Sequence, residues 1–575
     1  MEAVLHGFNA ITLFIAAIVV VSVLSTIFSF RAGAPILLVF LGVGFLAGED
    51  GIGRVDFDDA EVAFKVGSIA LALILFDSGF GTPLRSFRAA AAPAITLATL
   101  GVLLTTALFA LAARALLPLD WGQALLLGAI LASTDAAAVF FLLRAGGIHL
   151  RDRVRSTLEV ESGSNDPMAI FLTLALVGAL SAASAGWSWT DALLEFARQM
   201  GLGLAFGWVG GHIVRQAVNR LPLEIGLYPV LVAALAIAGF ALTNLAGGSG
   251  FLAVYVAGLL AAGERIRHAN ELKRFQQGLT WLAQIAMFVT LGLLATPSEF
   301  PAVLLPGVLL GLFLVFVARP LAVGLCLLPF RMSWQENLFV GFVGLRGAVS
   351  ILLAILPLMA ALPDARLLFN IAFIAVLVSL VVQGWGLAPV ARALHLVVPE
   401  RHGAIDRIQL DLPDEAAHEL VAYRLAADSP LIAERRMPRW VRPALVVRDG
   451  RSIRSMRVER LRAGDVIYVF VRPHRIPLLD RLVASPRAPD KSDREFFGDF
   501  AVDLDVPVAD LADFYGGDVH ADKRGLSVRH FLEREFGDAV EVGDRIGLGA
   551  IELIVREVDE RQRVVEAGLA VTPRG

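Results

Sequence analysis

The sequence has a single cysteine in 575 residues, Cys326, and it lies inside an apolar run. This excludes a disulfide framework and a cysteine-ligated metal site, so redox chemistry is not expected. Charged residues are also few, at 18% of the chain. The net charge of −4 at pH 7 gives no indication of a nucleic-acid partner.

The charge that is present is unevenly distributed along the chain. Before residue 395, long apolar runs alternate with short arginine-bearing loops, whereas the chain beyond residue 400 is rich in charge. Hydrophobic residues make up 57% of the sequence, and its mean hydropathy is +0.69. These values predict a membrane part at residues 1–395 followed by a soluble tail. The first ten residues lack Lys and Arg, so the first apolar run is predicted to be a retained helix and not a cleaved signal peptide.

The membrane part contains thirteen apolar runs of spanning length, since about 17 to 25 apolar residues cross a bilayer as a helix. Thirteen such runs in succession argue against the alternative that they are buried helices of a soluble core. The predicted fold class is an all-α polytopic membrane protein of about 13 transmembrane helices, followed by small α+β cytoplasmic domains. The predicted helices lie at residues 9–30, 34–48, 61–79, 90–117, 121–144, 155–181, 191–218, 224–244, 249–263, 279–296, 302–329, 335–361 and 366–394.

The distribution of Lys and Arg among the loops predicts the orientation in the membrane, because cytoplasmic loops are enriched in these residues. One set of alternate loops holds only Arg54, Arg114 and Arg366, beside acidic segments such as DFDDAE at 56–61. With an odd number of helices, this places the N-terminus outside and the tail in the cytoplasm. The other set of loops holds fifteen basic residues: Arg31, Arg85, Arg88, Arg144, Arg151, Arg153, Arg155, Arg215, Arg220, Arg265, Arg267, Lys273, Arg274, Arg331 and Arg392.

A few polar residues interrupt the predicted helices at membrane depth. Thr134 and Asp135 lie within the fifth helix, Asp166 in the sixth, Arg319 in the eleventh and Arg346 in the twelfth. Ionisable residues at such depth indicate a functional site, because burying them in the membrane is costly. The alternative for any one of them is a structural ion pair.

The sixth predicted helix opens with the segment LEVESGSNDP at 158–167. In a helix, Ser162 and Asp166 share one face, while Glu161 and Asn165 share a neighbouring one. The first face is expected to meet Asp135 of the preceding helix and form a cavity of oxygen ligands. Glu161 then needs a partner of its own, and a buried arginine is the most economical choice.

These oxygen atoms suit a monovalent cation. The side chains of Asp135, Asp166 and Ser162 and the carbonyl of Thr134 supply hard oxygen ligands without sulfur or imidazole. Two buried carboxylates are stable together only when a cation or a proton neutralises one of them. Cation and proton are therefore expected to compete for one site, which is the minimum chemistry of an antiporter.

Helix-breaking residues accompany the same positions. Pro167 follows Asp166 directly, Thr134 and Asp135 can turn backbone groups inward, and GFVGLRGA places three glycines around Arg346. Interrupted helices in a transporter line the binding site near the middle of the membrane. The sequence therefore predicts breaks at these positions.

Four motifs occur in order on the fifth, sixth, eleventh and twelfth predicted helices: ASTDAAAVF (132–140), ESGSNDP (161–167), FVARPL (316–321) and VGLRGAVS (343–350). They resemble those of the monovalent cation:proton antiporters of the NhaP and sodium/proton exchanger type, and the resemblance covers roughly residues 5–395. It implies a homodimer of two inverted repeats with broken helices, in which a core domain moves against a dimerisation domain.

The resemblance also implies a role for each motif residue. Asp166 would be the principal cation and proton carboxylate, Asp135 and the Thr134 carbonyl would complete the site, and Ser162 would add a hydroxyl. The neutral Asn165 stands where the electrogenic branch has a second aspartate, which implies electroneutral exchange of one cation for one proton. The resemblance further implies a structural bridge between Glu161 and Arg319, and a place for Arg346 in the broken twelfth helix.

The tail carries two further resemblances. Residues 404–486 are similar to the C-terminal domain of the regulator-of-potassium-conductance module (TrkA-C-like), and residues 497–575 to a CorC-type transporter-associated domain, with a linker at 485–495 between them. No predicted strand of the tail is followed by the GxGxxG pattern of a dinucleotide-binding site, so NAD is not expected. An unknown regulatory ligand, dimer support and a tail without a sensing role all stay open.

This domain combination resembles the potassium/proton antiporters described as cell volume regulation proteins. It implies K⁺ as the exchanged cation and the inner membrane of a bacterium as the location, with membrane lipid as a partner and no resident cofactor. A sodium/proton antiporter is the alternative within the same fold, because the ligand set alone does not separate the two ions.

Two other classes are less well supported by the sequence. An intramembrane aspartyl protease would also use two aspartates, but the second would lie in a GxGD motif, whereas Asp166 lies in SNDP. A cation channel needs no protonatable carboxylate in its pathway, and the sequence has no segment like the TVGYG filter.

Overall fold

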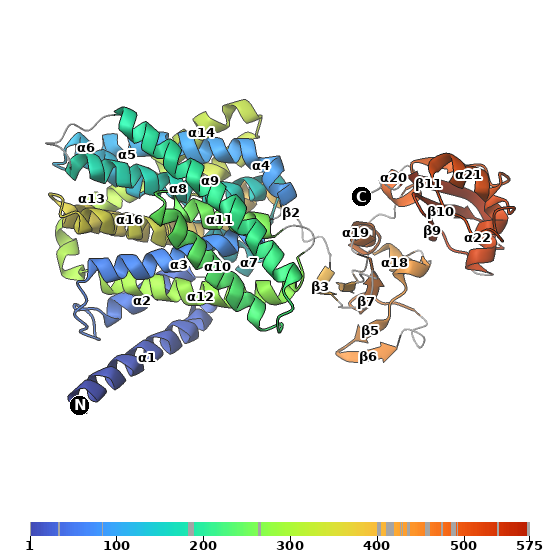
Figure 1. Ribbon diagram of the computed structural model, residues 1–575, viewed down its shortest axis with the longest axis horizontal. Coiled ribbons are helices and arrows are strands. Elements are labelled where there is room, and N and C mark those ends of the chain that lie inside the picture. Colours follow the sequence, from blue (N-terminus) through green and yellow to red (C-terminus); the bar gives the residue numbers. More distant parts are fainter. Residues whose placement is uncertain are drawn as a thin grey trace. The chain divides into compact units, whose positions relative to one another are not determined.

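The computed structural model describes residues 2–32, 35–82, 84–181, 189–262, 266–398, 404–409, 419–425, 427, 429–433, 438–454, 460–472, 475–484, 490–491, 493–537, 540–559 and 561–571. The chain divides into two compact units, Met1–Val398 and Pro399–Gly575. The first unit is almost entirely helical, and the second contains two antiparallel sheets (Figure 1).

The helices of the first unit form a layered bundle (Figure 1). Two short π-helical segments, η1 (Leu97–Gly101) and η3 (Leu314–Ala318), interrupt two of its long helices. The helices are α1 (Glu2–Ala32), α2 (Ile36–Ala47), α3 (Ala60–Gly81), α4 (Leu84–Thr96), α5 (Val102–Leu116), α6 (Trp121–Ile130), α7 (Ala136–Ala145), α8 (Asp152–Ser181), α9 (Trp189–Arg220), α10 (Leu227–Leu245), α11 (Gly250–Ala261), α12 (Ala269–Leu293), α13 (Phe300–Phe313), α14 (Arg319–Leu327), α15 (Trp334–Phe342), α16 (Ala348–Met359) and α17 (Ala365–Ala393).

Each of the thirteen predicted apolar runs contains a helix. Within the described residues, six helical stretches are long and apolar enough to cross a membrane by length and composition: Ala60–Gly81, Ala90–Leu116, Arg153–Ser181, Leu227–Leu245, Pro297–Phe330 and Ala365–Ala393. Two of the predicted helices are each divided in two. The range 121–144 becomes α6 and α7, and the range 335–361 becomes α15 and α16.

The sixth predicted helix differs from expectation in two ways. It begins at Asp152, so Asp166 lies half-way along α8 and not near its entrance. Pro167 also does not interrupt α8, which continues as one helix to Ser181. A proline removes a single backbone hydrogen bond, and neighbouring helices in a membrane bundle can hold the helix together across it.

Two series of three elements occur in the same order in the first unit. Each has a long helix with a π-helical segment (η1 or η3), a helix broken in its middle (α6–α7 or α15–α16) and a continuous helix (α8 or α17). Strand β1 (His149–Leu150), just before α8, pairs with β2 (Val397–Val398), just after α17. Since α8 begins where α17 ends, these two helices run in opposite directions, as inverted repeats require.

Close packing at glycines joins α3 to α11. A Cβ on Gly79 would lie 2.2 Å from the carbonyl oxygen of Tyr255, and a Cβ on Gly258 would lie 2.2 Å from that of Phe76. Small residues at membrane helix contacts allow two backbones to approach this closely. The result is a tightly joined pair of helices, and α11 carries Tyr255 on the side that faces α8.

The second unit contains two antiparallel sheets with separate hydrophobic cores. Part of the predicted linker, residues 485–489 and 492, lies outside the described residues. The first sheet has the order β3-β4-β7-β5-β6, with β3 (Ala404–Gln409), β4 (Glu419–Arg424), β5 (Leu445–Arg448), β6 (Arg451–Arg454) and β7 (Val466–Val471). The second has the order β8-β11-β10-β9, with β8 (Phe500–Val502), β9 (Arg545–Leu548), β10 (Ile551–Val558) and β11 (Val564–Val571).

Short helices accompany these sheets: α18 (Pro430–Ala433), α19 (Ile476–Ala484), α20 (Arg494–Phe497), α21 (Val508–Tyr515) and α22 (Val528–Phe536).

The two sheet regions of the tail also contact one another directly. Trp440 Nε1 donates a hydrogen bond to the carbonyl of Gly543, at 3.0 Å, and Phe496 of α20 belongs to the core of the first sheet. The two sheet regions of the tail are therefore joined by direct contacts as well as by the linker.

Candidate cation-binding site

The first helix break lies between α6 and α7. The side chain of Asp120 and that of Gln123 form a capping box at the start of α6, which then ends at Ile130. Residues 131–135 are not helical, and α7 begins at Ala136. Asp135 Oδ1 accepts a hydrogen bond from the backbone N–H of Ala138 at 3.1 Å, so Asp135 caps the N-terminus of α7.

The second break, residues 343–347, lies between α15 and α16. It crosses the first break and bonds to it, because the N–H of Asp135 donates to the carbonyl of Leu345 at 2.8 Å. Two glycines permit close approach here. A Cβ on Gly347 would lie 2.7 Å from Asp135 Oδ2, and a Cβ on Gly344 would lie 2.8 Å from Arg319 Nε. Two of the three glycines of GFVGLRGA thus leave space for the side chains that pack over them.

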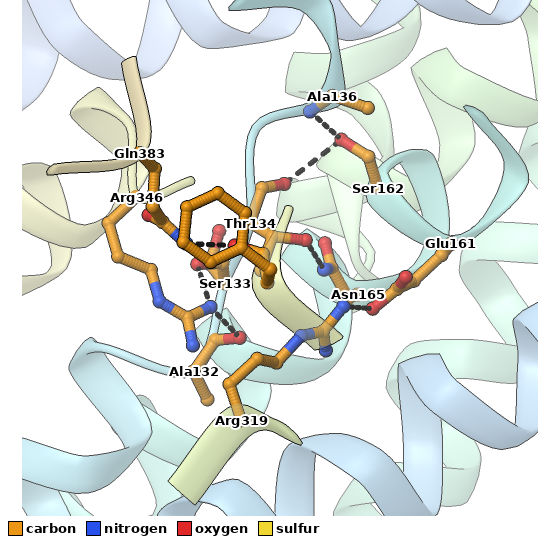
Figure 2. Close-up of polar contacts among 11 residues, drawn as sticks. Ala132, Ser133, Thr134, Ala136, Glu161, Ser162, Asn165, Arg319, Arg346 and Gln383 are labelled. Atoms are coloured by element: carbon orange, nitrogen blue, oxygen red, sulfur yellow. Dashed lines mark hydrogen bonds and ion pairs between the residues drawn. The ribbon is translucent and has the colours of Figure 1, made fainter. Parts of the chain in front are cut away.

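Ser162 of α8 bonds to both sides of Asp135. Its hydroxyl donates to the carbonyl of Thr134 at 2.9 Å and accepts from the N–H of Ala136 at 3.0 Å. Figure 2 shows this hydroxyl between the two backbone groups. The Thr134 carbonyl and the Ser162 hydroxyl, both predicted as cation ligands, are therefore in direct contact with each other.

One turn further along α8, Asn165 and Asp166 reach the same break. Asn165 Nδ2 donates to Thr134 Oγ1 at 2.6 Å, and the hydroxyl of Ser133 donates to Asp166 Oδ1. Both α8 side chains are buried, with Asp166 only 5% exposed. The sequence places Asn165 on the face of the helix that it shares with Glu161, and not with the predicted cation ligands. In the fold this face also reaches the break, because Asn165 bonds to Thr134.

Ser133 is a site residue that sequence reasoning missed. It is 2% exposed and supplies the hydrogen bond to the central carboxylate. Its position directly before Thr134 and Asp135 in the sequence could have indicated that it belongs to the site. A serine in an apolar helix often bonds its own backbone, however, so its direction became evident only in the folded chain.

Glu161 and Arg319 form an ion pair inside the bundle. Arg319 Nη2 donates to Glu161 Oε1. The side chain of Glu161 is 1% exposed and that of Arg319 is 2% exposed. Arg319 directly follows the π-helical segment η3, and Figure 2 shows it extending toward Glu161. The pair joins α8 to α14 next to Asn165.

Arg346 binds the part of the first break that directly follows the C-terminal end of α6. Its Nη1 donates to the carbonyls of Ala132 and Ser133, at 2.8 and 2.7 Å (Figure 2). The C-terminal end of a helix carries partial negative charge, so a cation is well placed there. Arg346 thus connects the two breaks through its side chain, and Leu345 connects them through its backbone.

A cavity of about 480 Å³ reaches this region from one end of the bundle. Ser162 and the first turn of α7 (Ala136–Ala138) line its inner part, and the side chains of Asp77, Glu159, Arg155 and Lys273 also line it. Asp77 Oδ2 accepts a hydrogen bond from Thr280 Oγ1 at 2.9 Å. The cavity therefore brings Ser162 and several charged side chains into one lining.

Gly163 of α8 lies directly beneath the ring of Tyr255, and this contact yields a prediction. A Cβ on Gly163 would lie 2.1 Å from Tyr255 Cε2. We expect Gly163→Ala to destabilise the purified protein by about 1–3 kcal/mol through overpacking, measured as a lower melting temperature in detergent. Adding Tyr255→Leu should restore part of that stability, because the shorter side chain leaves room for the methyl group.

The matched control is Gly178→Ala on the same helix, where a Cβ would meet nothing within 4 Å. It should melt no lower than the parent protein. Equal melting temperatures for Gly163→Ala and Gly178→Ala would show that the close contact with Tyr255 is wrong.

The crossing of two broken helices, with Asp135 in the first break and the buried Asp166 beside it, defines the class of this protein as a secondary membrane transporter. The family model described as "Sodium/hydrogen exchanger, transmembrane" matches residues 15–393, and the chain belongs to this family. The family resemblance found in the sequence is therefore confirmed.

Two relatives align along nearly their whole length. The K(+)/H(+) antiporter NhaP of Alkalimonas amylolytica is 41% identical, with 99% of each chain covered. The K(+)/H(+) antiporter NhaP2 of Shewanella baltica is 40% identical, with 96% of each chain covered. Among solved structures, the sodium proton antiporter MjNhaP1 of Methanocaldococcus jannaschii matches with a TM-score of 0.59 and 23% identity, covering 67% of this chain and 99% of its own. The first unit thus has the fold of that antiporter.

Proposed function

We propose that this protein exchanges a cytoplasmic monovalent cation, K⁺ in the first place, for external protons, one for one. The observation that carries the proposal is the position of Asp166. Its carboxylate is buried half-way along α8, at the crossing of two helix breaks, and a hydroxyl donates to it. A carboxylate in such a place needs a neutralising charge, which either a cation or a proton supplies.

Asp166 is assigned the central role in binding both the cation and the proton. Asp135, the Thr134 carbonyl and the Ser162 hydroxyl complete the proposed ligand set. The contacts of Ser162 with Thr134 and Ala136 support this set, because they keep these oxygens within one small region. When the cation binds, the Ser162 hydroxyl would rotate away from the Thr134 carbonyl, and both oxygens would then face the cation.

The cavity that ends at Ser162 is assigned as the cytoplasmic entrance. Arg155 and Lys273 line it, and both belong to the basic loops that orientation rules place in the cytoplasm. The N-terminus would then lie outside and the tail in the cytoplasm, in the inner membrane of a bacterium. Asp77 and Glu159 give the cavity carboxylates that attract cations.

The neutral Asn165 supports exchange without net movement of charge. It occupies a buried position next to Asp166, and it bonds to Thr134 as an amide. With one titrating carboxylate carrying either one cation or one proton, each cycle would be electroneutral. An aspartate at this position would add a second charge.

Potassium is favoured over sodium by the relatives that align along their whole length, because both are named K(+)/H(+) antiporters. Sodium is the second candidate, since the structural neighbour is a sodium proton antiporter.

We further propose a homodimer, with residues 404–486 as the regulator-of-potassium-conductance C-terminal domain and residues 497–575 as the CorC-type domain. Cation and cell volume homeostasis is the corresponding role.

The test uses everted membrane vesicles with a pre-formed proton gradient, followed by a pH-sensitive dye. Added K⁺ should dissipate the gradient in vesicles containing the protein and not in vesicles from cells lacking it. A panel of K⁺, Na⁺, Li⁺ and choline then gives the selectivity. Dissipation by Na⁺ alone would replace potassium by sodium in the proposal, and no response to any of the four would overturn it.

The stoichiometry needs a separate measurement in proteoliposomes. A membrane potential imposed with a gradient of a permeant anion such as thiocyanate, with K⁺ held at the same concentrations, should leave the rate of K⁺ exchange unchanged. A rate that depends on the potential would contradict one-for-one exchange.

A further inference from the structure

Two buried polar side chains of α17, Ser379 and Gln383, lie outside the ligand set. They are four residues apart on one face of the helix, and both are 0% exposed. The hydroxyl of Ser379 donates to Gln383 Oε1, so the two side chains form a connected pair. An isolated amide in a membrane bundle is costly unless its hydrogen bonds are satisfied, so the partners of this pair indicate its role.

Those partners are two backbone groups at the second helix break, one at the end of α15 and one within the break. Gln383 Nε2 donates to the carbonyl of Phe342, where α15 ends, and Ser379 Oγ accepts from the N–H of Arg346 at 2.9 Å. A broken helix leaves carbonyls unpaired on one side and N–H groups unpaired on the other. The α17 pair satisfies one of each and so fixes the distance across the break. Figure 2 shows Gln383 beside Arg346.

The second break in turn holds the first. Arg346 bonds through its side chain to the carbonyls of Ala132 and Ser133, and Leu345 bonds through its carbonyl to the N–H of Asp135. Ser133 then donates to Asp166. A continuous chain of hydrogen bonds therefore runs from Gln383 and Ser379 to the carboxylates of the proposed site.

We infer that Ser379 and Gln383 are positioning residues for cation binding, acting through Arg346 and Leu345 on the segment that carries Asp135. The inference rests on the proposed function and deepens it. Hydrogen-bond partners fixed by packing preorganise a site. A change that weakens cation binding without removing the carboxylates raises the apparent KM and leaves the maximal rate unchanged. Apparent cation affinity is therefore the property that these two residues control.

The experiment compares Gln383→Leu and Ser379→Ala with the parent protein in the vesicle assay, at several cation concentrations and pH values. Gln383→Leu keeps the volume and loses both hydrogen bonds. For each variant we expect the apparent KM for K⁺ to rise at least about 5-fold, with a change in maximal rate of less than about 2-fold. The pH range over which protons inhibit exchange should move as well, because protons and cations compete for the same carboxylate.

Conservative variants test whether the hydrogen bonds matter and not the bulk of the side chains. Ser379→Thr keeps the hydroxyl and should restore the parent KM, whereas Gln383→Asn has an amide too short to span both partners and should not. Thr243→Val is the matched control: Thr243 is also buried, but its hydroxyl bonds to Gly239 of its own helix, α10. Its KM should equal that of the parent.

Parent values of KM and pH range in Gln383→Leu, Gln383→Asn and Ser379→Ala would overturn the inference while leaving the proposed antiport intact. A lower maximal rate in proportion to the amount of folded protein, with KM unchanged, would assign the pair a purely structural role and also overturn it. Failure of the parent protein to exchange any cation would instead overturn the proposed function. If Gln383→Leu and Ser379→Ala do not fold, Gln383→Asn and Ser379→Thr decide the outcome through the same KM comparison.

Discussion

Vesicles containing Asp166→Asn should show no cation-dependent dissipation of a proton gradient. Asparagine has nearly the same shape and can still accept the hydrogen bond that Ser133 donates to Asp166. It carries neither the negative charge that a cation requires nor a proton that it can release. Since folding contacts are kept and only charge is lost, the expected effect is a fall of exchange to the background of protein-free vesicles.

Two further Asp→Asn variants make this result specific. Asp120 caps α6 at an exposed position, and asparagine caps a helix as well as aspartate does, so Asp120→Asn should exchange at the parent rate. Asp135→Asn keeps an oxygen for the N–H of Ala138 but removes the charge, and it should also lose exchange. Asp166→Asn exchanging at the parent rate would show that the mechanism proposed for this site is wrong.

Removing one partner of the ion pair between Glu161 and Arg319 should cost more stability than any other single change at the site. Both side chains are almost fully buried, so Glu161→Gln or Arg319→Gln strands an uncompensated charge. Such a loss is typically about 3–5 kcal/mol. We expect either single variant to give much less monodisperse protein in detergent, with a lower melting temperature.

The double variant Glu161→Gln with Arg319→Met should melt above either single variant, because no unpaired charge remains buried. The control is Arg198→Gln, which breaks a solvent-exposed pair with Glu195 and should change stability by less than about 1 kcal/mol. Normal yield and melting temperature for both single variants would count against a buried pair between Glu161 and Arg319.

The charged residues of the site could be recognised from the sequence because ionisable side chains are rare within membrane helices. Asp166, Asp135, Arg319 and Arg346 lie in runs that are otherwise apolar, so each had to have a reason to be there. Their helix positions also followed from hydropathy alone. The four residues come from α8, the first break, α14 and the second break, which the fold gathers into one region.

Other features depended on neighbours far away in sequence. Pro167 predicted a break, but α8 is continuous there, because helix stability across a proline is decided by the surrounding bundle. Ser133, Ser379 and Gln383 carry no charge and did not stand out from their apolar runs. Their partners in Asp166, Arg346 and Phe342 are 33, 33 and 41 residues away along the chain, which no local pattern reveals.

The sequence by itself determined the membrane class, the helical segments, the family and the residues with buried charge. The membrane class and the helical segments follow from local composition, since about 20 apolar residues suffice for a membrane helix. The family follows from short motifs that are read along the chain. The tertiary structure alone decided which hydroxyl faces Asp166, how Arg346 joins the two breaks and how α17 completes the second one. Hydrogen bonds are short and directional, so their pairing is fixed only when the helices are packed in three dimensions.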